Sequence, residues 1–389
     1  MSKVSVYDVV FVGGGASTLF CASLIKNKKV AILESNHKCG AKLEISGGGK
    51  CNITNKIVSS SNFIGDREFI ENALKHFDNK KLLEYLEKSK INYKESKRVV
   101  DGQIFLDSSK ILIKHLLFEN KQHDIFTSTK VLSVSFDGIY TIFCENKTLQ
   151  SKQLVIASGG ISYPSVGISD IGYKIGEYFG HTITTATPAL VGFTVQKDEF
   201  WWKELAGIST EITISIGEKR FQGEMLFTHK GCSGPAILNS SLYWEKGKME
   251  IDFLCGRKAE ELLKNGDSKK QISSILPLPK RFIKSFLSTI NLEDKKIPLL
   301  NKAEIQKLSL LNSYPFSPAG KLGFYRAEIT KGGIKSSELY HDTMESKKQK
   351  GLYFIGEVID VNGELGGYNL QWAFCSGYIC AENLRKMSK

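Results

Sequence analysis

The sequence predicts an α/β protein in which one parallel-sheet domain is interrupted by a nested insertion. Residues 6–34 have the pattern strand, glycine turn, helix, strand, and residues 351–384 have the pattern strand, glycine-bearing loop, helix. Between them, a β-rich segment surrounds a lysine-rich helical segment. We therefore expect the two ends to form one domain and the middle of the chain to supply two insertions.

The opening segment is predicted to be a βαβ unit. Residues 6–12 are short, β-branched and aromatic, as is typical of a buried parallel strand. Helical apolar spacing starts at Ala16, and residues 28–34 form a second strand that ends in an acid. Helices are then expected over residues 67–90 and 108–120, the second capped by its first or second serine.

Further strands are expected over residues 128–160, where the last strand runs into Gly159 and Gly160. Strand patterns dominate residues 193–255, whereas residues 257–313 are lysine-rich and helical. The predicted boundaries are 1–190 with 336–389 for the parallel-sheet domain, 191–255 with 314–335 for the β-rich insertion, and 256–313 for the helical insertion.

Length and composition indicate an ordinary globular protein. A chain of 389 residues is too long for one simple core and is expected to hold two or three domains. No apolar run is long enough to span a membrane, and Asp8 interrupts the only apolar stretch near the N-terminus. The eight cysteines are scattered without a CxxC pair. We therefore expect reduced thiols, no metal site and a cytoplasmic location.

The chain is basic, with a formal net charge of +12 and a sequence pI near 9.1. This charge favours a polyanionic partner such as RNA. A generally lysine-rich composition explains it equally well, so charge alone does not decide between the two.

The first glycine cluster predicts a dinucleotide-binding site of the Rossmann type. Gly13 and Gly15 occupy the first two positions of G-x-G-x-x-G between a strand and a helix, whose N-terminus attracts a pyrophosphate. Glu34 ends the second strand, where a carboxylate can accept hydrogen bonds from an adenosine ribose. Thr18 stands at the third glycine position. We expect cofactor contacts from Gly13, Gly15, Ala16, Ser17, Glu34 and Ser35.

This cluster suits either NAD or FAD, and the C-terminal segment favours FAD. A strand there ends in Gly356-Glu357, and a helix begins near Gly366-Gly367 after a loop that contains Asp360. FAD needs such a carboxylate near its ribityl or pyrophosphate region and a helix N-terminus at its pyrimidine ring. No second G-x-G-x-x-G motif is present, so NAD(P)H is expected only as a transient electron donor.

Several blocks resemble the BaiN-like flavoproteins, also described as an aminoacetone-oxidase-type or NAD(FAD)-utilising family. They are "FVGGGAS", "KLEISGGGKCNITN", "ASGGISYPSVGISDIGY", "GEMLFTHKGCSGPAIL" and "DTMESKKQKGLYFIGEVIDVNGELGGYNLQWAFCSGY", in family order over residues 6–383. The resemblance implies a Rossmann-type domain with non-covalent FAD, a β-barrel-like insertion and a small helical domain. Thr18 departs from the family pattern, as does Ala41 ahead of Lys42, where an arginine is usual.

The resemblance also implies a reaction. Members of the family are linked to the reduction of carbon–carbon double bonds in bile acids and in uridine of large-subunit ribosomal RNA. We therefore expect reduction of a uridine C5=C6 bond in 23S ribosomal RNA to dihydrouridine. The alternatives are a small-molecule NAD(P)H:enone reductase or amine oxidase, and an RNA-binding flavoprotein whose flavin is structural or sensing.

The second glycine cluster, "SGGGKCNITN", is expected to contact the same cofactor nearer its flavin. Successive glycines allow the backbone to lie against a flat ring, and Lys50 can contact an anion. The remaining cofactor contacts that we expect are Lys42, Ser46, Gly47, Gly48, Gly49, Lys50, Cys51, Asn52, Gly159, Gly160, Gly356, Glu357, Asp360, Gly366, Gly367, Asn369, Leu370 and Gln371.

Two side chains are candidates for the acid that protonates the reduced substrate. Cys51 would lie beside the flavin as a proton donor, or it would simply fill space below the cofactor. His229 lies in a loop before a predicted helix and would protonate substrate, bind an RNA phosphate or play a structural part. The pair Trp201-Trp202 would stack on a base or pack in the core of the β-rich domain.

Overall fold

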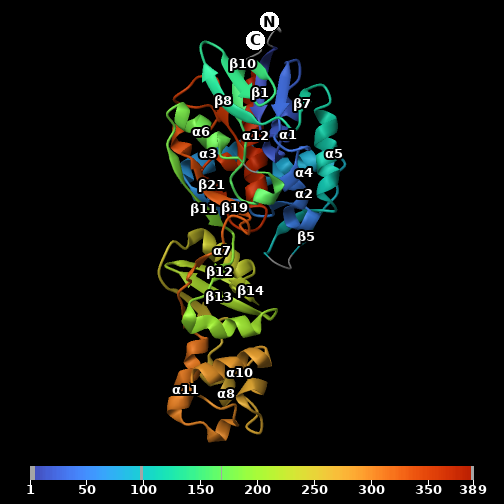
Figure 1. Cartoon of the computed structure of the whole chain (residues 1–389). Coiled ribbons are helices and arrows are strands. Elements are labelled where there is room, and N and C mark those ends of the chain that lie inside the picture. The colour runs from blue at the N-terminus through green and yellow to red at the C-terminus, as the bar shows by residue number, and fades with distance from the viewer. Residues whose placement is uncertain (1–4, 97–99, 168, 387–389) are drawn as a thin grey trace. The chain divides into compact units, whose positions relative to one another are not determined.

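The computed structural model describes residues 5–96, 100–167 and 169–386. The chain divides into two compact units (Figure 1). The first combines the chain up to Pro188 with the chain from Glu328, and the second runs from Ala189 to Ala327. The domain at the two ends of the sequence is thus a single unit.

The first unit is built around a mixed sheet in the order β7-β2-β1-β10-β9-β8, with β20 also paired to β10. Its central strands are parallel and buried, which explains their continuous apolar sequences. Strands β8 and β9 form an antiparallel extension. The strands are β1 (Val6–Val12), β2 (Val30–Leu33), β7 (Asp124–Phe126), β8 (Val131–Phe136), β9 (Tyr140–Cys144), β10 (Thr148–Ile156) and β20 (Leu352–Phe354).

Three small sheets complete this unit. The chain pairs β3 (Asn52–Asn55) and β5 (Tyr93–Ser96) with β6 (Gln103–Leu106). It also pairs β4 (Phe63–Gly65) with β21 (Val361–Gly363), and β11 (Ile183–Ala189) with β19 (Ile329–Ile334).

The helices of the first unit follow the predicted pattern with one exception. The stretch predicted as one helix over residues 67–90 is two helices, because Phe77 leaves the helical conformation and the Asp78 side chain accepts a hydrogen bond from Lys81 N to start a second one. Ser108 caps the next helix. The helices are α1 (Ala16–Leu24), α2 (Ala41–Ile45), α3 (Arg67–His76), α4 (Asn79–Lys88), α5 (Ser109–Glu119), α6 (Ile171–Tyr178) and α12 (Tyr368–Lys386).

Helices α1 and α12 pack closely against each other in the middle of this unit (Figure 1). A Cβ on Gly377 would lie 2.8 Å from the carbonyl oxygen of Ser17, so only glycine fits there. Thr18, at the third position of the glycine motif, is fully buried, and its hydroxyl has no hydrogen-bond partner. The close helix approach therefore depends on a glycine of α12 and not on the motif itself.

A polar network joins the segment that follows α6 to the C-terminal part of the chain. His181 Nε2 lies 2.7 Å from Ser346 Oγ, and His181 Nδ1 lies 3.1 Å from Glu338 Oε2. Ser346 is buried, and its hydroxyl also accepts hydrogen bonds from two backbone N–H groups, so it is a structural group and not an accessible nucleophile. Burial raises the pKa of Glu338, but hydrogen bonds from Lys348 and Thr182 outweigh this and hold it at about 2.

The second unit contains an antiparallel sheet in the order β17-β16-β13-β14-β15-β12-β18. Its strands are β12 (Phe193–Thr194), β13 (Ser209–Ile216), β14 (Lys219–Thr228), β15 (Gly231–Ser233), β16 (Met249–Asp252), β17 (Tyr314–Phe316) and β18 (Gly320–Lys321). Its helices are α7 (Pro235–Tyr243), α8 (Ala259–Lys264), α9 (Ile272–Ile275), α10 (Lys280–Thr289) and α11 (Lys302–Leu308).

One apolar core serves both the sheet and the helices of the second unit. Trp202 is fully buried with its ring centroid 4.8 Å from that of Phe316. Trp201 packs on Phe282 of α10 at 5.7 Å. Both tryptophans thus pack in the core, which was one of the two roles expected for them; the other was stacking on a base.

Glu199 lies in the same core, three residues before Trp202 on a 3-10 helix (Lys197–Leu205). Burial, and secondarily Asp198, raise the pKa of Glu199. Its Oε2 and the indole nitrogen of Trp202 are both buried without a hydrogen-bond partner. Burial of this carboxyl group therefore makes its charged form less favourable than that of an exposed glutamate.

The three-domain division remains a prediction, and the two compact units do not follow its boundaries everywhere. Residues 256–313 share their core with the β-rich segment. Residues 328–335 belong to the first unit, because β19 pairs with β11. In the part of the chain that the structure describes, no helix is long and apolar enough to cross a membrane.

Candidate cofactor and active site

The predicted cofactor contacts all belong to the first unit, and many meet at the carboxyl ends of its parallel strands. Val12 at the end of β1 is level with Leu33 of β2 and with Ile156 of β10, which is itself level with Phe354 of β20. The segments that follow these strands carry the first glycine cluster, Glu34, Gly159-Gly160 and Gly356-Glu357. Ligands of open α/β sheets bind at this edge.

At two positions of the first cluster, Gly13 and Gly14, a side chain would collide with neighbouring protein atoms. Gly13 has φ +104°, and a Cβ there would lie 2.4 Å from the carbonyl oxygen of Ala157. A Cβ on Gly14 would lie 2.7 Å from Cys39 Sγ. Gly14 N donates a hydrogen bond to Glu34 Oε2 at 2.8 Å, which fixes this buried carboxylate beside the turn.

Gly15 is different, because the protein itself does not require a glycine there. Its φ is −80°, and a Cβ would meet no protein atom within 4 Å. Gly15 is also the N-cap of α1, where no side chain accepts a hydrogen bond from the first turn. Free N–H groups at a helix N-terminus and open space beside the backbone are what a pyrophosphate needs.

The second glycine cluster forms an open backbone surface. Ser46–Gly49 is a short 3-10 helix in which Gly47 and Gly48 have φ 55° and 66° and are exposed. A Cβ on Gly48 would meet no protein atom within 4 Å, and the same holds for Gly159 after β10. Lys50 is exposed, and Ser46 donates its hydroxyl hydrogen to Leu43 O.

Asn52, next to this loop, has a side chain that also fits a bound ligand. Its side-chain oxygen is buried and has no hydrogen-bond partner. Buried polar atoms are almost always paired, so an unpaired oxygen beside an open glycine surface fits a bound polar group. The residues present therefore fit a dinucleotide with a flat ring.

Lys42 and Glu357 form an ion pair at this edge. Lys42 Nζ lies 2.9 and 2.7 Å from the two oxygens of Glu357 and 2.9 Å from Ser162 Oγ. Glu357 also accepts a hydrogen bond from Thr330 N at 3.0 Å. Lys42 thus holds Glu357 in place, and both residues were predicted to contact the cofactor.

The start of α12 is placed by its glycines. A Cβ on Gly367 would lie 2.4 Å from the carbonyl oxygen of Thr54, and Gly366 has φ +145°. Strand β3 therefore packs directly on the beginning of α12. Asp360 accepts a hydrogen bond from Asn362 Nδ2 at 2.7 Å, so it too is engaged within the loop.

The structure gives three other predicted contacts different surroundings. Gln371 is fully buried, and its amide accepts from Thr54 Oγ1 and donates to Phe77 O. Asn369 uses its amide to bond both the N–H and the carbonyl of Gly363. Leu370 is half-buried. These side-chain bonds favour a structural role for Gln371 and Asn369.

Cys51 is enclosed by protein. It has no exposed surface, and burial raises the pKa of its thiol to about 12. Its φ is +53°, and its backbone N–H bonds Ser46 O at 3.0 Å, which closes the glycine loop. The thiol keeps its proton at neutral pH but has no accessible face, which favours the space-filling role.

His229 belongs to the second unit, on the exposed turn between β14 and β15. Its role as an acid stays a prediction. In the described part of the chain, no group of three or more His, Cys, Asp or Glu side chains is arranged to hold a metal ion.

Sequence reasoning missed two residues at this edge. Thr330 Oγ1 accepts a hydrogen bond from Ile161 N at 2.8 Å, and a Cβ on Gly160 would lie 2.5 Å from that hydroxyl oxygen. Ser162 is fully buried and bonds Lys42. The only sequence sign of Thr330 is the glycine pair that follows it in "ITKGGI", where Gly332 and Gly333 both have positive φ.

The parallel sheet, the glycine turn and the acid after β2 define a Rossmann-type dinucleotide-binding protein. The chain belongs to the HI0933-like family, whose Rossmann-domain model matches residues 7–383. This agrees with the resemblance to the BaiN-like flavoproteins.

Two curated relatives cover almost the whole chain. It is 35% identical to the Escherichia coli "Ribosomal RNA dihydrouridine synthase", over 97% of this chain and 98% of that protein. It is 28% identical to the Clostridium scindens "3-dehydro-bile acid delta(4,6)-reductase", over 95% and 96%.

A solved structure supports the fold. The 3-ketosteroid-delta4-(5alpha)-dehydrogenase from Rhodococcus jostii matches with a TM-score of 0.54 and 12% identity, over 100% of this chain and 98% of that one. At this identity the similarity concerns the fold alone.

Proposed function

We propose that this protein reduces the C5=C6 bond of a uridine in 23S ribosomal RNA to give dihydrouridine. The observation that carries the proposal is the 35% identity, over nearly the full length of both chains, to a protein named ribosomal RNA dihydrouridine synthase. The more general conclusion, that the protein is an FAD-dependent oxidoreductase, agrees with its family and with its fold. The ribosomal RNA substrate is the finer and proposed part.

FAD, when bound, supplies the hydride equivalent that the double bond takes up. The chain's own residues would hold it along the carboxyl edge of the sheet. The N–H groups at the start of α1, next to Gly15, would bind the pyrophosphate, and Glu34 would accept hydrogen bonds from the adenosine ribose. Glu357, fixed by Lys42, would accept from the ribityl or pyrophosphate region.

Gly47 and Gly48 would lie against the flavin ring, with the unpaired oxygen of Asn52 as an acceptor. This assignment is supported by the left-handed, exposed glycines and by the absence of protein atoms beside Gly48. The backbone of Gly159, which follows β10, is likewise open.

Reduction of the double bond also needs a proton at the carbon next to the one that receives the hydride. Cys51 carries a proton at neutral pH, but its enclosure supports a packing role. His229 stays a candidate because its side chain is exposed.

A single-turnover experiment tests the proposal without assuming an electron donor. Purified FAD-loaded protein is reduced with dithionite under anaerobic conditions and mixed with 23S ribosomal RNA transcribed in vitro. We expect flavin reoxidation together with about one dihydrouridine per flavin, detected by mass spectrometry as a gain of roughly 2 Da. Flavin that stays reduced, with unmodified RNA, contradicts the proposal.

The similarity to the bile acid reductase favours a second candidate, reduction of a small enone. Both substrates contain a carbon–carbon double bond conjugated to a carbonyl, so the same hydride transfer serves either. Reoxidation by a small steroid enone, with ribosomal RNA inert under the same conditions, would select this alternative. NAD(P)H is proposed as the transient donor in both cases, and bleaching of the flavin by NADH or NADPH tests it.

A further inference from the structure

The positive charge of the chain is concentrated in the helical part of the second unit. Residues 256–313 contain twelve lysines and arginines against six aspartates and glutamates, a net charge of +6, which is half the +12 of the whole protein. These 58 residues are a small fraction of the 389. A generally lysine-rich composition would spread the excess evenly, so this distribution needs another explanation.

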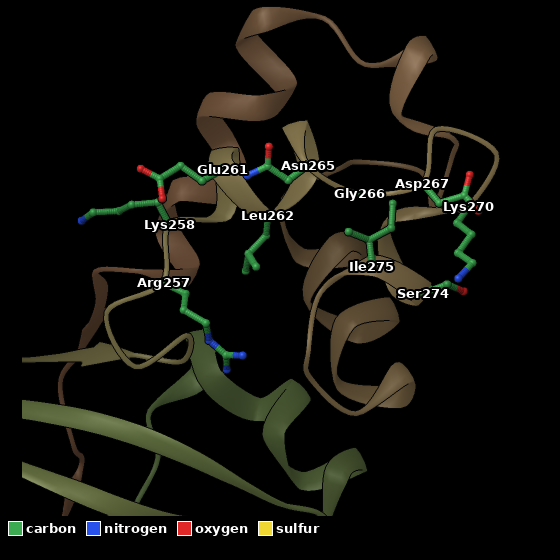
Figure 2. Close-up of a pocket in the computed structure, with 10 residues that line it drawn as sticks. All are labelled: Arg257, Lys258, Glu261, Leu262, Asn265, Gly266, Asp267, Lys270, Ser274 and Ile275. Atoms are coloured by element: carbon green, nitrogen blue, oxygen red, sulfur yellow. The ribbon is translucent and has the colours of Figure 1, made fainter.

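Part of this charge surrounds a hollow of about 410 Å3 (Figure 2). Its cationic lining consists of Arg257, Lys258 and Lys270, all exposed. Figure 2 shows Arg257 at one end of the hollow and Lys270, with Ser274, at the other. Asn265 and Ser274 add neutral hydrogen-bonding groups.

Further lysines lie close to Lys270, either next to it in the sequence or on a segment bridged to Gln271. Gln271 forms an antiparallel bridge with Lys296, and Ile272 N bonds Lys295 O at 3.2 Å. The backbone of residues 271–272 therefore lies beside that of 295–296. Lys269 and Lys296 are exposed, whereas Lys295 is engaged with Glu304 at 2.7 Å.

Two carboxylates line the hollow as well, those of Glu261 and Asp267. Asp267 Oδ1 accepts a hydrogen bond from Lys269 N at 2.9 Å, so it is partly used in shaping the loop. The lining itself thus carries three cations and two acids, and the exposed Lys269 and Lys296 lie outside it but close to Lys270 along the backbone. Cations for phosphates beside acceptors for 2′-hydroxyls suit an RNA backbone better than a simple anion.

We propose that this basic hollow, lined by Arg257, Lys258 and Lys270 with Lys269 and Lys296 nearby, docks the sugar–phosphate backbone of the ribosomal RNA substrate. The inference rests on the proposed function for the identity of the RNA. It assigns the helical part of the chain a role in holding the substrate, separate from the chemistry in the first unit.

The test compares two double variants that lose the same charge. K258Q/K270Q changes the hollow, and K280Q/K284Q changes two exposed lysines of α10, which has no acidic residue. Binding of each FAD-loaded protein to in vitro transcribed 23S ribosomal RNA is measured by filter retention from about 50 to 300 mM salt. Flavin absorbance and melting temperature check that both variants remain folded.

We expect the hollow variant to bind on the order of tenfold more weakly and to lose roughly 1.5 from the slope of log K against log salt, as two lost phosphate contacts require. The α10 variant should bind within about twofold of wild type. Equal weakening of both variants, unchanged binding of the hollow variant, or a wild type without RNA affinity overturns the inference.

The dihydrouridine assay separates this failure from that of the proposed function. Wild-type protein that modifies RNA while K258Q/K270Q binds normally refutes only the docking site. RNA that binds through the hollow but is never reduced refutes only the proposed reaction.

Discussion

Replacing Gly15 with alanine should separate cofactor binding from folding. The backbone at Gly15 has an ordinary φ of −80°, and the new Cβ would meet no protein atom within 4 Å. The stability of the cofactor-free protein should therefore change by less than about 1 kcal/mol. A methyl group in the space meant for the pyrophosphate should weaken FAD binding at least about tenfold, or roughly 1.4 kcal/mol.

Gly13→Ala is the matched control. Its Cβ would lie 2.4 Å from Ala157 O, and its φ of +104° is a conformation that alanine rarely adopts. This variant should lose on the order of 3 kcal/mol of folding stability even without cofactor.

Both variants are compared with wild type after removal of the flavin. Denaturant unfolding gives the free energy of unfolding of each apoprotein, and quenching of FAD fluorescence gives the dissociation constant. An apoprotein of Gly15→Ala that unfolds early, or one that binds FAD as tightly as wild type, would refute the reasoning.

Three further predictions concern buried groups. Cys51→Ala should cost about 1 kcal/mol of stability and change single-turnover reduction less than about threefold; a loss near 100-fold with FAD still bound would instead make the thiol the proton donor. Glu199→Gln should stabilise the protein by on the order of 1 kcal/mol at pH 7, because a raised folded pKa costs stability as pH rises above the unfolded value; an equal or lower melting temperature contradicts this. Glu338 has a pKa lowered to about 2, so its contribution to folding stability is present above about pH 4.5 and lost as pH falls toward 2. Glu338→Gln should remove on the order of 1 kcal/mol of this loss from the free energy of unfolding plotted against pH, and an unchanged pH dependence refutes the assignment.

The parts of the fold that local sequence patterns specify were predictable. The strand of residues 6–12 and the glycine turn after it follow from apolar runs and glycine positions. The break between α3 and α4 was missed because the apolar stripe continues through Phe77, while the capping carboxylate of Asp78 decides where the second helix begins.

The site was harder to predict, because its contacts join residues far apart in the sequence. Gln371 follows a glycine pair like a cofactor ligand, yet Thr54 and Phe77, some 300 positions away, occupy its amide. The pairing of Lys42 with Glu357 spans a similar separation. Periodicity shows which face of an element is buried but not which distant side chain it meets.

The proposed reaction is tested most directly by mapping the modifications of 23S ribosomal RNA from a strain that lacks the gene. We predict that one uridine, roughly 2 Da heavier in the parent strain, returns to its unmodified mass in the deletion strain. Wild-type protein should restore the modification, and a variant shown to have lost FAD should not. An identical set of dihydrouridines in parent and deletion strains would contradict the account.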